Sequence, residues 1–166
     1  HEDYFMHPKI QEAARDISIL FNQKPKSGIA KITAICEEEN IPLTEAIAEF
    51  FYQEKQNLDL ESVGDYLSGP DEENKDVLQA FTKQLSFEGQ SFVSGLRNFL
   101  QTFKLPGEAQ KIDRLVESFS KAYCEQNPNA IASNDSAYVL AFQTIMLNTG
   151  NFQDSCRLKQ SRFALL

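Results

Sequence analysis

The sequence has few of the residues that most often carry catalysis or bind metals. Among its 166 residues there are no Trp, 2 His and 3 Cys. Both histidines, His1 and His7, lie at the amino-terminal end, where neither a Ser-His-Asp triad nor a histidine metal site can be assembled. Cys36, Cys124 and Cys156 lack the spacing of a zinc site, and their odd number leaves one thiol unpaired under any disulfide scheme. We therefore expect no metal and no bound cofactor.

Long apolar runs are also missing. The longest nearly apolar stretch covers residues 137–147, whereas a membrane-spanning helix needs about 20 residues. Acidic residues (24) outnumber basic residues (16), which gives a formal net charge of -8, and acidic runs occur at residues 37–39 and 71–76. Such runs repel phosphate backbones and anionic lipids. We expect a monomer that binds no nucleic acid and has no direct membrane-binding element.

Apolar residues recur at helical spacing along most of the chain, and no stretch alternates with a period of two for long enough to predict a strand. Pro8 suits the first position of a helix that ends near Asn22. Further helical stripes follow, separated by short segments that contain proline or glycine. The length suits one domain with a substantial core. We predict a single all-α domain with at least seven helices, in which these side chains are buried: Phe50, Phe81, Leu96, Phe99, Ile112, Leu115, Phe119 and Leu140.

A tight bend at Pro106–Gly107 separates two helical patterns within the stretch FKLPGEAQKIDR, residues 103–114. Pro fixes one backbone angle, and Gly permits conformations that other residues avoid, so the bend should be well defined. Glu108 follows directly, at the start of the next helix. Its carboxylate there favours the positive end of the helix dipole. Position alone therefore leaves a purely structural role for Glu108 open.

The stretch DSAYVLAFQTIMLNT, residues 135–149, predicts a helix that is apolar on two sides. One side holds Leu140, Ala141 and Leu147. The other side holds Tyr138, Phe142, Ile145 and Met146. A helix with two apolar sides either lies at the centre of a core or offers one side to a partner.

Together, the stretches at residues 103–114 and 135–149 resemble the two signature motifs of the Sec7 domain, the guanine-nucleotide exchange module for Arf-family small GTPases. The resemblance extends from about Ile17 to Thr149. The stretches FNQKPKSGIAKI and NLDLESVGDYLS are most similar to Sec7 domains of effectors that intracellular bacteria inject into host cells. This resemblance implies a single elongated, superhelical array of short helices. It also implies a cytoplasmic protein that acts in the host cytosol, at membranes that carry Arf.

The resemblance further assigns a role to each motif. In the family, the glutamate that Glu108 matches enters the nucleotide site of the GTPase, close to the β-phosphate and to the place that Mg²⁺ occupied. The second motif forms the floor of a hydrophobic groove that accepts the GTPase switch regions, so the side that holds Leu140 should face the core. The matching groove residues are Asp135, Tyr138, Val139, Phe142, Ile145 and Met146. Support of the loop falls to Leu105, Pro106, Gly107, Asp113 and Arg114, although the last two could instead make only surface ion pairs.

After Thr149 the sequence departs from the family pattern. Sec7 domains usually continue with a Leu-His-Asn-Pro-like turn whose asparagine contacts the GTPase, and Phe152 and Gln153 stand here in place of its His and Asn. From the sequence after Thr149 we expect the last family helices to be missing. We predict a flexible segment at residues 1–7, an incomplete Sec7-like domain at 8–149 and a divergent, poorly ordered tail at 150–166.

Two functions are compatible with these features. The first is a guanine-nucleotide exchange factor for an Arf-family GTPase in its GDP-bound or nucleotide-free form, which expels GDP and Mg²⁺ without covalent chemistry. The second is a catalytically weak module that binds a GTPase or another helical partner without exchange. The intact Glu108 loop and the apolar helix favour the first function, and the altered carboxyl end favours the second.

Overall fold

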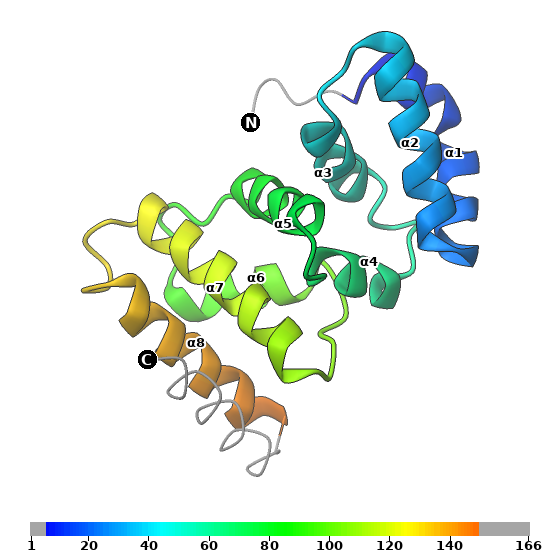
Figure 1. Cartoon of the computed structure of the whole chain (residues 1–166). Coiled ribbons are helices and arrows are strands. Elements are labelled where there is room, and N and C mark those ends of the chain that lie inside the picture. Colours follow the sequence, from blue (N-terminus) through cyan, green and yellow to red (C-terminus); the bar gives the residue numbers. More distant parts are fainter. Residues whose placement is uncertain (1–5, 150–166) are drawn as a thin grey trace.

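The computed structural model describes residues 6–149 and shows eight helices and no strand within that range (Figure 1). The expectation of an all-α fold is therefore confirmed. The helices, in chain order, are α1 (Pro8–Gln23), α2 (Pro25–Glu39), α3 (Leu43–Gln53), α4 (Leu60–Leu67), α5 (Glu72–Gln84), α6 (Phe92–Leu100), α7 (Ala109–Gln126) and α8 (Asn134–Thr149). The predictions for residues 1–5 and for the tail, including Phe152 and Gln153, lie outside the described residues.

Local sequence explains several helix starts. Pro8 occupies the first turn of α1, as predicted, and the His7 side chain accepts a hydrogen bond from the Lys9 backbone N–H. Asp59 caps α4, because its carboxylate accepts hydrogen bonds from the backbone N–H and the hydroxyl of Ser62. The amino-terminal ends of α1 and α4 are therefore capped by residues that directly precede them, independently of long-range packing.

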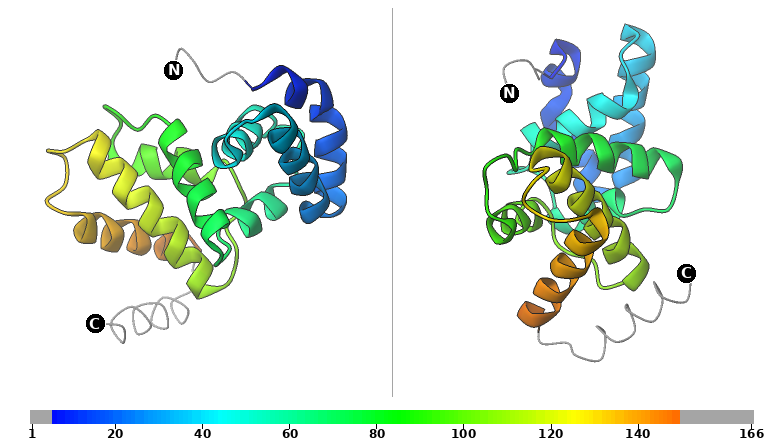
Figure 2. Two further views of the ribbon diagram at one scale, coloured as in Figure 1. Left: turned by 45° about the horizontal axis from the view of Figure 1, so that its top comes forward. Right: turned by 90° about the vertical axis from the view of Figure 1, so that its left-hand side faces the viewer.

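The helices form an elongated array. The pairs α1 and α2, α3 and α5, and α7 and α8 make the most extensive contacts. In Figures 1 and 2, α1 and α2 lie at one end of the molecule and α8 at the other, packed along α7. Helix α4 lies in the middle, close to the segment that enters α7 (Figure 1). Among the described residues, no helix is long and apolar enough to cross a membrane.

Aromatic side chains dominate the core and form two clusters. In the first, Phe51 makes edge contacts with Phe21 and Tyr66, at centroid distances of 5.3 Å for both. The second lies between α6 and α7 and contains Phe87, Phe92, Phe99, Phe103, Phe119 and Tyr123. Phe103, the last aromatic residue before the Pro106–Gly107 bend, is 2% exposed and packs on Phe99 at 5.1 Å. The aromatic core therefore fixes the point at which the bend begins.

Seven of the eight side chains that were predicted to be buried are indeed buried. The exception is Leu140, which is 43% exposed, so that prediction is wrong. Its exposure follows from the orientation of α8, which is described below.

Candidate functional site

We call residues 101–108, between α6 and α7, the finger loop. Glu108 is the N-cap residue of α7, but its side chain makes no capping hydrogen bond. The side chain is 73% exposed, and its Oε1 lies 3.6 Å from Lys111 Nζ. The carboxylate is therefore not used to close the helix that it precedes. A capping hydrogen bond therefore does not explain the acidic residue at this position, although the helix dipole still favours a carboxylate there.

Helix α4 holds the finger loop at its amino-terminal side. The Lys104 N–H donates a hydrogen bond of 3.0 Å to the Leu60 carbonyl. Gly64 faces the same segment so closely that a Cβ there would lie 2.3 Å from the Lys104 carbonyl oxygen. The Lys104 ammonium also lies 3.8 Å from the Glu61 carboxylate. A residue without a side chain at position 64 is therefore needed for the loop to approach α4.

The same helix also holds the segment that follows the loop. Lys111 Nζ lies 3.3 Å from Asp65 Oδ1, and Arg114 Nε donates a 2.7 Å hydrogen bond to the carbonyl of Ser68, the C-cap residue of α4. Arg114 is half-buried. The finger loop is thus fastened to α4 on both sides of Glu108. The sequence left two roles open for Arg114, support of the loop or a surface ion pair. Its hydrogen bond to the Ser68 carbonyl agrees better with support of the loop.

Asp113 connects α7 to α8, because its carboxylate accepts a 2.5 Å hydrogen bond from the Tyr138 hydroxyl. Leu105 and Pro106 are half-buried, whereas Gly107 is exposed. Gly107 does not have a positive φ, and a Cβ built on it would meet no atom within 4 Å. The unusual backbone conformation expected at Gly107 is therefore absent, and nothing within the described chain requires glycine there.

The predicted orientation of α8 is wrong. Tyr138, Phe142 and Ile145, which were expected to be open to a partner, are only 6%, 3% and 3% exposed. Leu140 and Leu147, which were expected in the core, are 43% and 81% exposed. Leu140 and Leu147 thus lie on the outer surface of the described structure, whereas Ala141, which was grouped with them, is buried as expected.

The physical reason lies in how α8 meets α7. Ala137 and Ala141 are fully buried, and small side chains at this spacing allow two helices to approach closely. The neighbouring Tyr138 and Phe142 rings stack at 6.2 Å and fill the space beside them. Val139 is 44% exposed, and Asp135 is exposed in the first turn of α8. A partner role for the residues named in this helix remains a prediction.

A shallow groove of about 230 Å³ lies between α6 and α8 and reaches the finger loop. Its lining residues are Val93, Leu96, Arg97, Leu100, Gln101, Leu105, Thr144 and Ile145. Of these, Ile145 was predicted from the sequence as a groove residue, and Leu105 was predicted only as support for the loop. Met146 is half-buried and packs against the core.

The contribution of α6 to this groove was missed. Its residues were treated only as core, although Val93 is 50% exposed and Arg97 is also exposed. An available signal was the chain order, because α6 runs directly into the finger loop. The second signal was Val93, an apolar residue that does not belong to the buried stripe of α6 and therefore suggests a second apolar surface on that helix.

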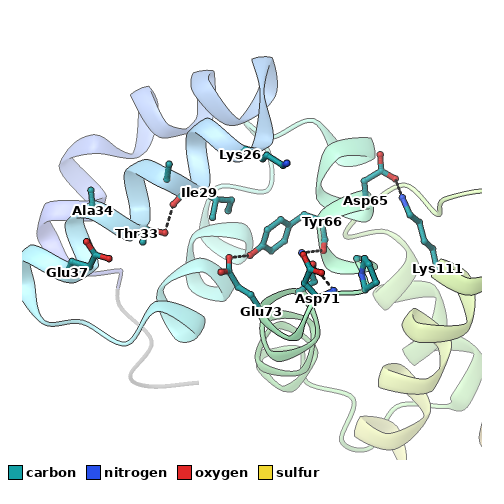
Figure 3. A pocket seen from close by; sticks show the side chains of 14 residues that line it. Lys26, Ile29, Thr33, Ala34, Glu37, Asp65, Tyr66, Asp71, Glu73 and Lys111 are labelled. Carbon is teal, nitrogen blue, oxygen red and sulfur yellow. Dashed lines mark hydrogen bonds and ion pairs between the residues drawn. The ribbon is translucent and has the colours of Figure 1, made fainter.

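A larger cavity of about 660 Å³, lined in part by Lys111, lies between α2, the α4–α5 junction and the start of α7 (Figure 3). Ile29 and Ala34 contribute apolar surface to it. The Tyr66 hydroxyl donates a 2.7 Å hydrogen bond to Glu73. Burial and this carboxylate raise the pKa of Tyr66, so the phenol stays protonated. Among the described residues, no cluster of three or more His, Cys, Asp or Glu could hold a metal ion.

Comparison with known proteins shows close relatives. A sequence model of the Sec7 domain matches residues 10–164. Human brefeldin A-inhibited guanine nucleotide-exchange protein 1 is 49% identical over 133 residues, which are 78% of this chain and 7% of that protein. A crystal structure that joins the Sec7 domain of Legionella pneumophila RalF to the capping domain of Rickettsia prowazekii RalF has a TM-score of 0.85 and 62% identity, and the match covers 91% of this chain and 44% of that one.

A third relative is the Sec7 domain in the structure of ARF1-GDP bound to a Sec7 domain complexed with brefeldin A. It has a TM-score of 0.72 and 29% identity, and the match covers 87% of this chain and 72% of that one. The chain belongs to the Sec7 domain family. It spans 7% of the length of the human relative.

Proposed function

We propose that this chain is a guanine-nucleotide exchange factor for an Arf-family small GTPase. The observation that carries the proposal is the position of Glu108. Its carboxylate is exposed, makes no capping bond, and stands on a loop that α4 fastens on both sides. The groove between α6 and α8 reaches the same loop through Leu105. The Glu108 carboxylate and the apolar groove therefore lie on, or next to, the same loop.

The chemistry of nucleotide release is electrostatic. When the finger loop enters the nucleotide site of the GTPase, Glu108 brings a negative charge close to the phosphates. Two unit charges 4 Å apart interact by about 4 kcal/mol at an effective dielectric constant of 20. About 1.4 kcal/mol changes an equilibrium constant tenfold. Repulsion of this size weakens nucleotide binding greatly, and a carboxylate also competes with the phosphate for the lysine of the GTPase P-loop.

The groove supplies the binding energy that brings the two charges together. Its apolar residues, which include Val93, Leu100 and Leu105, can be covered by an apolar segment of the GTPase. Burial of apolar surface contributes about 25 cal/mol per Å². Binding to this surface selects a GTPase conformation that holds nucleotide and Mg²⁺ poorly. The open space around Gly107 leaves room for the partner's backbone beside Glu108.

Two relatives support the choice of partner. The human relative is named as a guanine nucleotide-exchange protein, and one structural relative is a Sec7 domain bound to ARF1-GDP. We further propose that the chain acts in the cytosol of a host cell. This location rests on the resemblance to Sec7 effectors that bacteria inject into host cells, and the 62% identity to the Sec7 domain of a bacterial protein, Legionella pneumophila RalF, agrees with that resemblance.

A fluorescence assay of nucleotide release from an Arf protein tests the proposal. The wild-type chain should accelerate release, and Glu108→Lys should abolish the acceleration, because the reversed charge attracts phosphate. The melting temperature should stay nearly unchanged, since an exposed substitution alters stability by about 0.5 kcal/mol or less. Equal rates for the wild type and the variant would show that Glu108 is only a helix-start residue.

The apolar outer side of α8 favours a second candidate, a module that binds a helical partner without exchange. Val139, Leu140 and Leu147 are exposed there, and no described element covers them. Stable binding of an Arf protein without any acceleration of nucleotide release would favour this candidate over the first.

A further inference from the structure

Lys111 lies between two carboxylates. Its Nζ is 3.3 Å from Asp65 Oδ1 on α4 and 3.6 Å from Glu108 Oε1. Only the contact with Asp65 is also a hydrogen bond. The Lys111 side chain is 21% exposed, whereas those of Asp65 and Glu108 are 54% and 73% exposed. Figure 3 shows Lys111 reaching toward Asp65 along the wall of the large cavity.

One ammonium group cannot compensate two carboxylates fully. The shorter contact and the hydrogen bond give Asp65 the larger share of Lys111. Glu108 keeps the looser contact and most of its exposure to solvent. Exposed ion pairs of this kind are weak. Glu108 can therefore leave Lys111 at little cost as long as Asp65 keeps the lysine.

We propose that Asp65 is a positioning residue for nucleotide exchange, which acts by competing with Glu108 for Lys111, so that Glu108 keeps only the longer contact with the lysine. This role rests on the exchange function proposed above. Without Asp65, Glu108 is the remaining carboxylate that contacts Lys111 in the described structure. The lysine then accompanies Glu108 and offsets the negative charge that repels the nucleotide phosphates.

Asp65→Asn tests this role, because the amide keeps the size of the side chain and removes its charge. We expect kcat for nucleotide release to fall about fivefold, with KM for the GTPase changed by less than about twofold, since the groove is untouched. The defect should shrink in about 0.5 M salt, which screens the extra Lys111–Glu108 attraction. Glu72→Gln is the matched control, because it removes a carboxylate from the Glu72–Lys75 surface pair on α5, away from the finger loop.

The double variant Asp65→Asn with Lys111→Gln separates electrostatics from structure. If Asp65 acts by occupying the lysine, removal of Lys111 should restore at least about half of the lost rate. A double variant as slow as Asp65→Asn, or slower, would overturn the proposal, because it would show that the Asp65–Lys111 pair only supports the loop. An Asp65→Asn variant as fast as the wild type would overturn it as well.

Carbodiimide cross-linking of the chain without GTPase gives an independent readout. The wild type should yield an amide between Lys111 and Asp65, and in Asp65→Asn the link between Lys111 and Glu108 should increase. No such increase would overturn the proposed movement of the lysine. If the wild type catalyses exchange and Asp65→Asn is equally fast, only the role of Asp65 is overturned. If the wild type itself does not catalyse exchange, both the proposed function and the role of Asp65 are overturned.

Discussion

The finger loop and helix α8 correspond to the two sequence motifs, and they are built in opposite ways. The finger loop is anchored in the core by Phe103, ends in the exposed Gly107 and Glu108, and is held on α4 by directed contacts such as the Lys104 to Leu60 hydrogen bond. Helix α8 is apolar and is held by close packing, with Ala141 fully buried and Phe142 3% exposed. The loop therefore depends on the shape of its neighbour α4, and the helix depends on which of its sides α7 covers.

This difference explains why one motif could be interpreted from sequence more fully than the other. A Pro-Gly pair followed by Glu specifies a bend and a carboxylate at a helix start through local chemistry alone. A helix with two apolar sides does not specify which side is inward, because that choice depends on the partner helix. The predictions below test each side of this comparison.

The largest effect is expected for Phe142→Ala on the inner side of α8. Phe142 is 3% exposed and stacks on Tyr138 at 6.2 Å. Loss of a buried phenylalanine costs about 3–5 kcal/mol, because it removes apolar contacts and leaves a cavity. Chemical denaturation should show this loss in the free energy of unfolding.

Leu140→Ala is the matched control on the outer side. Leu140 is 43% exposed, so its truncation should cost less than about 1 kcal/mol. A larger loss of unfolding free energy for Leu140→Ala than for Phe142→Ala would support the orientation of α8 that was predicted from the sequence and contradict the structure.

Gly64→Ala tests whether α4 positions the finger loop. The new Cβ would lie 2.3 Å from the Lys104 carbonyl oxygen, so the loop must move away from α4. Overpacking of this kind costs about 1–3 kcal/mol. We expect nucleotide release to slow about tenfold while binding of the GTPase to the groove persists. Gly107→Ala is a control for folding only, because its Cβ meets no atom of this chain within 4 Å, whereas the space beside Gly107 is the one proposed above for the partner's backbone.

Met146→Ala tests whether the groove side carries affinity. Met146 is half-buried and packs against the core; it does not line the groove, but it follows Ile145, which does. A large apolar side chain at the centre of an interface is worth about 1–3 kcal/mol, so binding of nucleotide-free Arf should weaken roughly tenfold. The dependence on salt should be mild, because the lost contact is apolar.

Leu147→Ala is the comparison for this measurement, since Leu147 is 81% exposed on the outer side. Binding of Arf should not change in that variant. If Leu147→Ala weakens binding and Met146→Ala does not, the partner docks on the outer side of α8 rather than on the groove.

Much of the fold and part of the candidate site could be predicted from the sequence. Helical periodicity identified the all-α class, and seven core residues were placed correctly. The exposed Glu108 after a bend also followed from local chemistry. The close approach of Gly64 to Lys104 and the Asp65–Lys111 ion pair could not be derived, because they depend on the packing of α4 against a segment about 40 residues further along the chain. The orientation of α8 failed for the same reason, since packing against α7 decides it.

The smallest effect is expected for Tyr138→Phe, which removes one hydrogen bond between the two motifs. The Tyr138 hydroxyl donates a hydrogen bond to Asp113 on α7, one turn beyond the finger loop. The phenyl ring keeps its place on Phe142, so the loss should be limited to the hydrogen bond, about 1 kcal/mol of stability. Thermal unfolding and the exchange assay together show where this bond acts. A drop in melting temperature of a few degrees with an unchanged exchange rate would mean that it only fastens α8 to α7. A slower rate, measured well below the melting temperature, would mean that the orientation of α8 is transmitted through Asp113 to the finger loop.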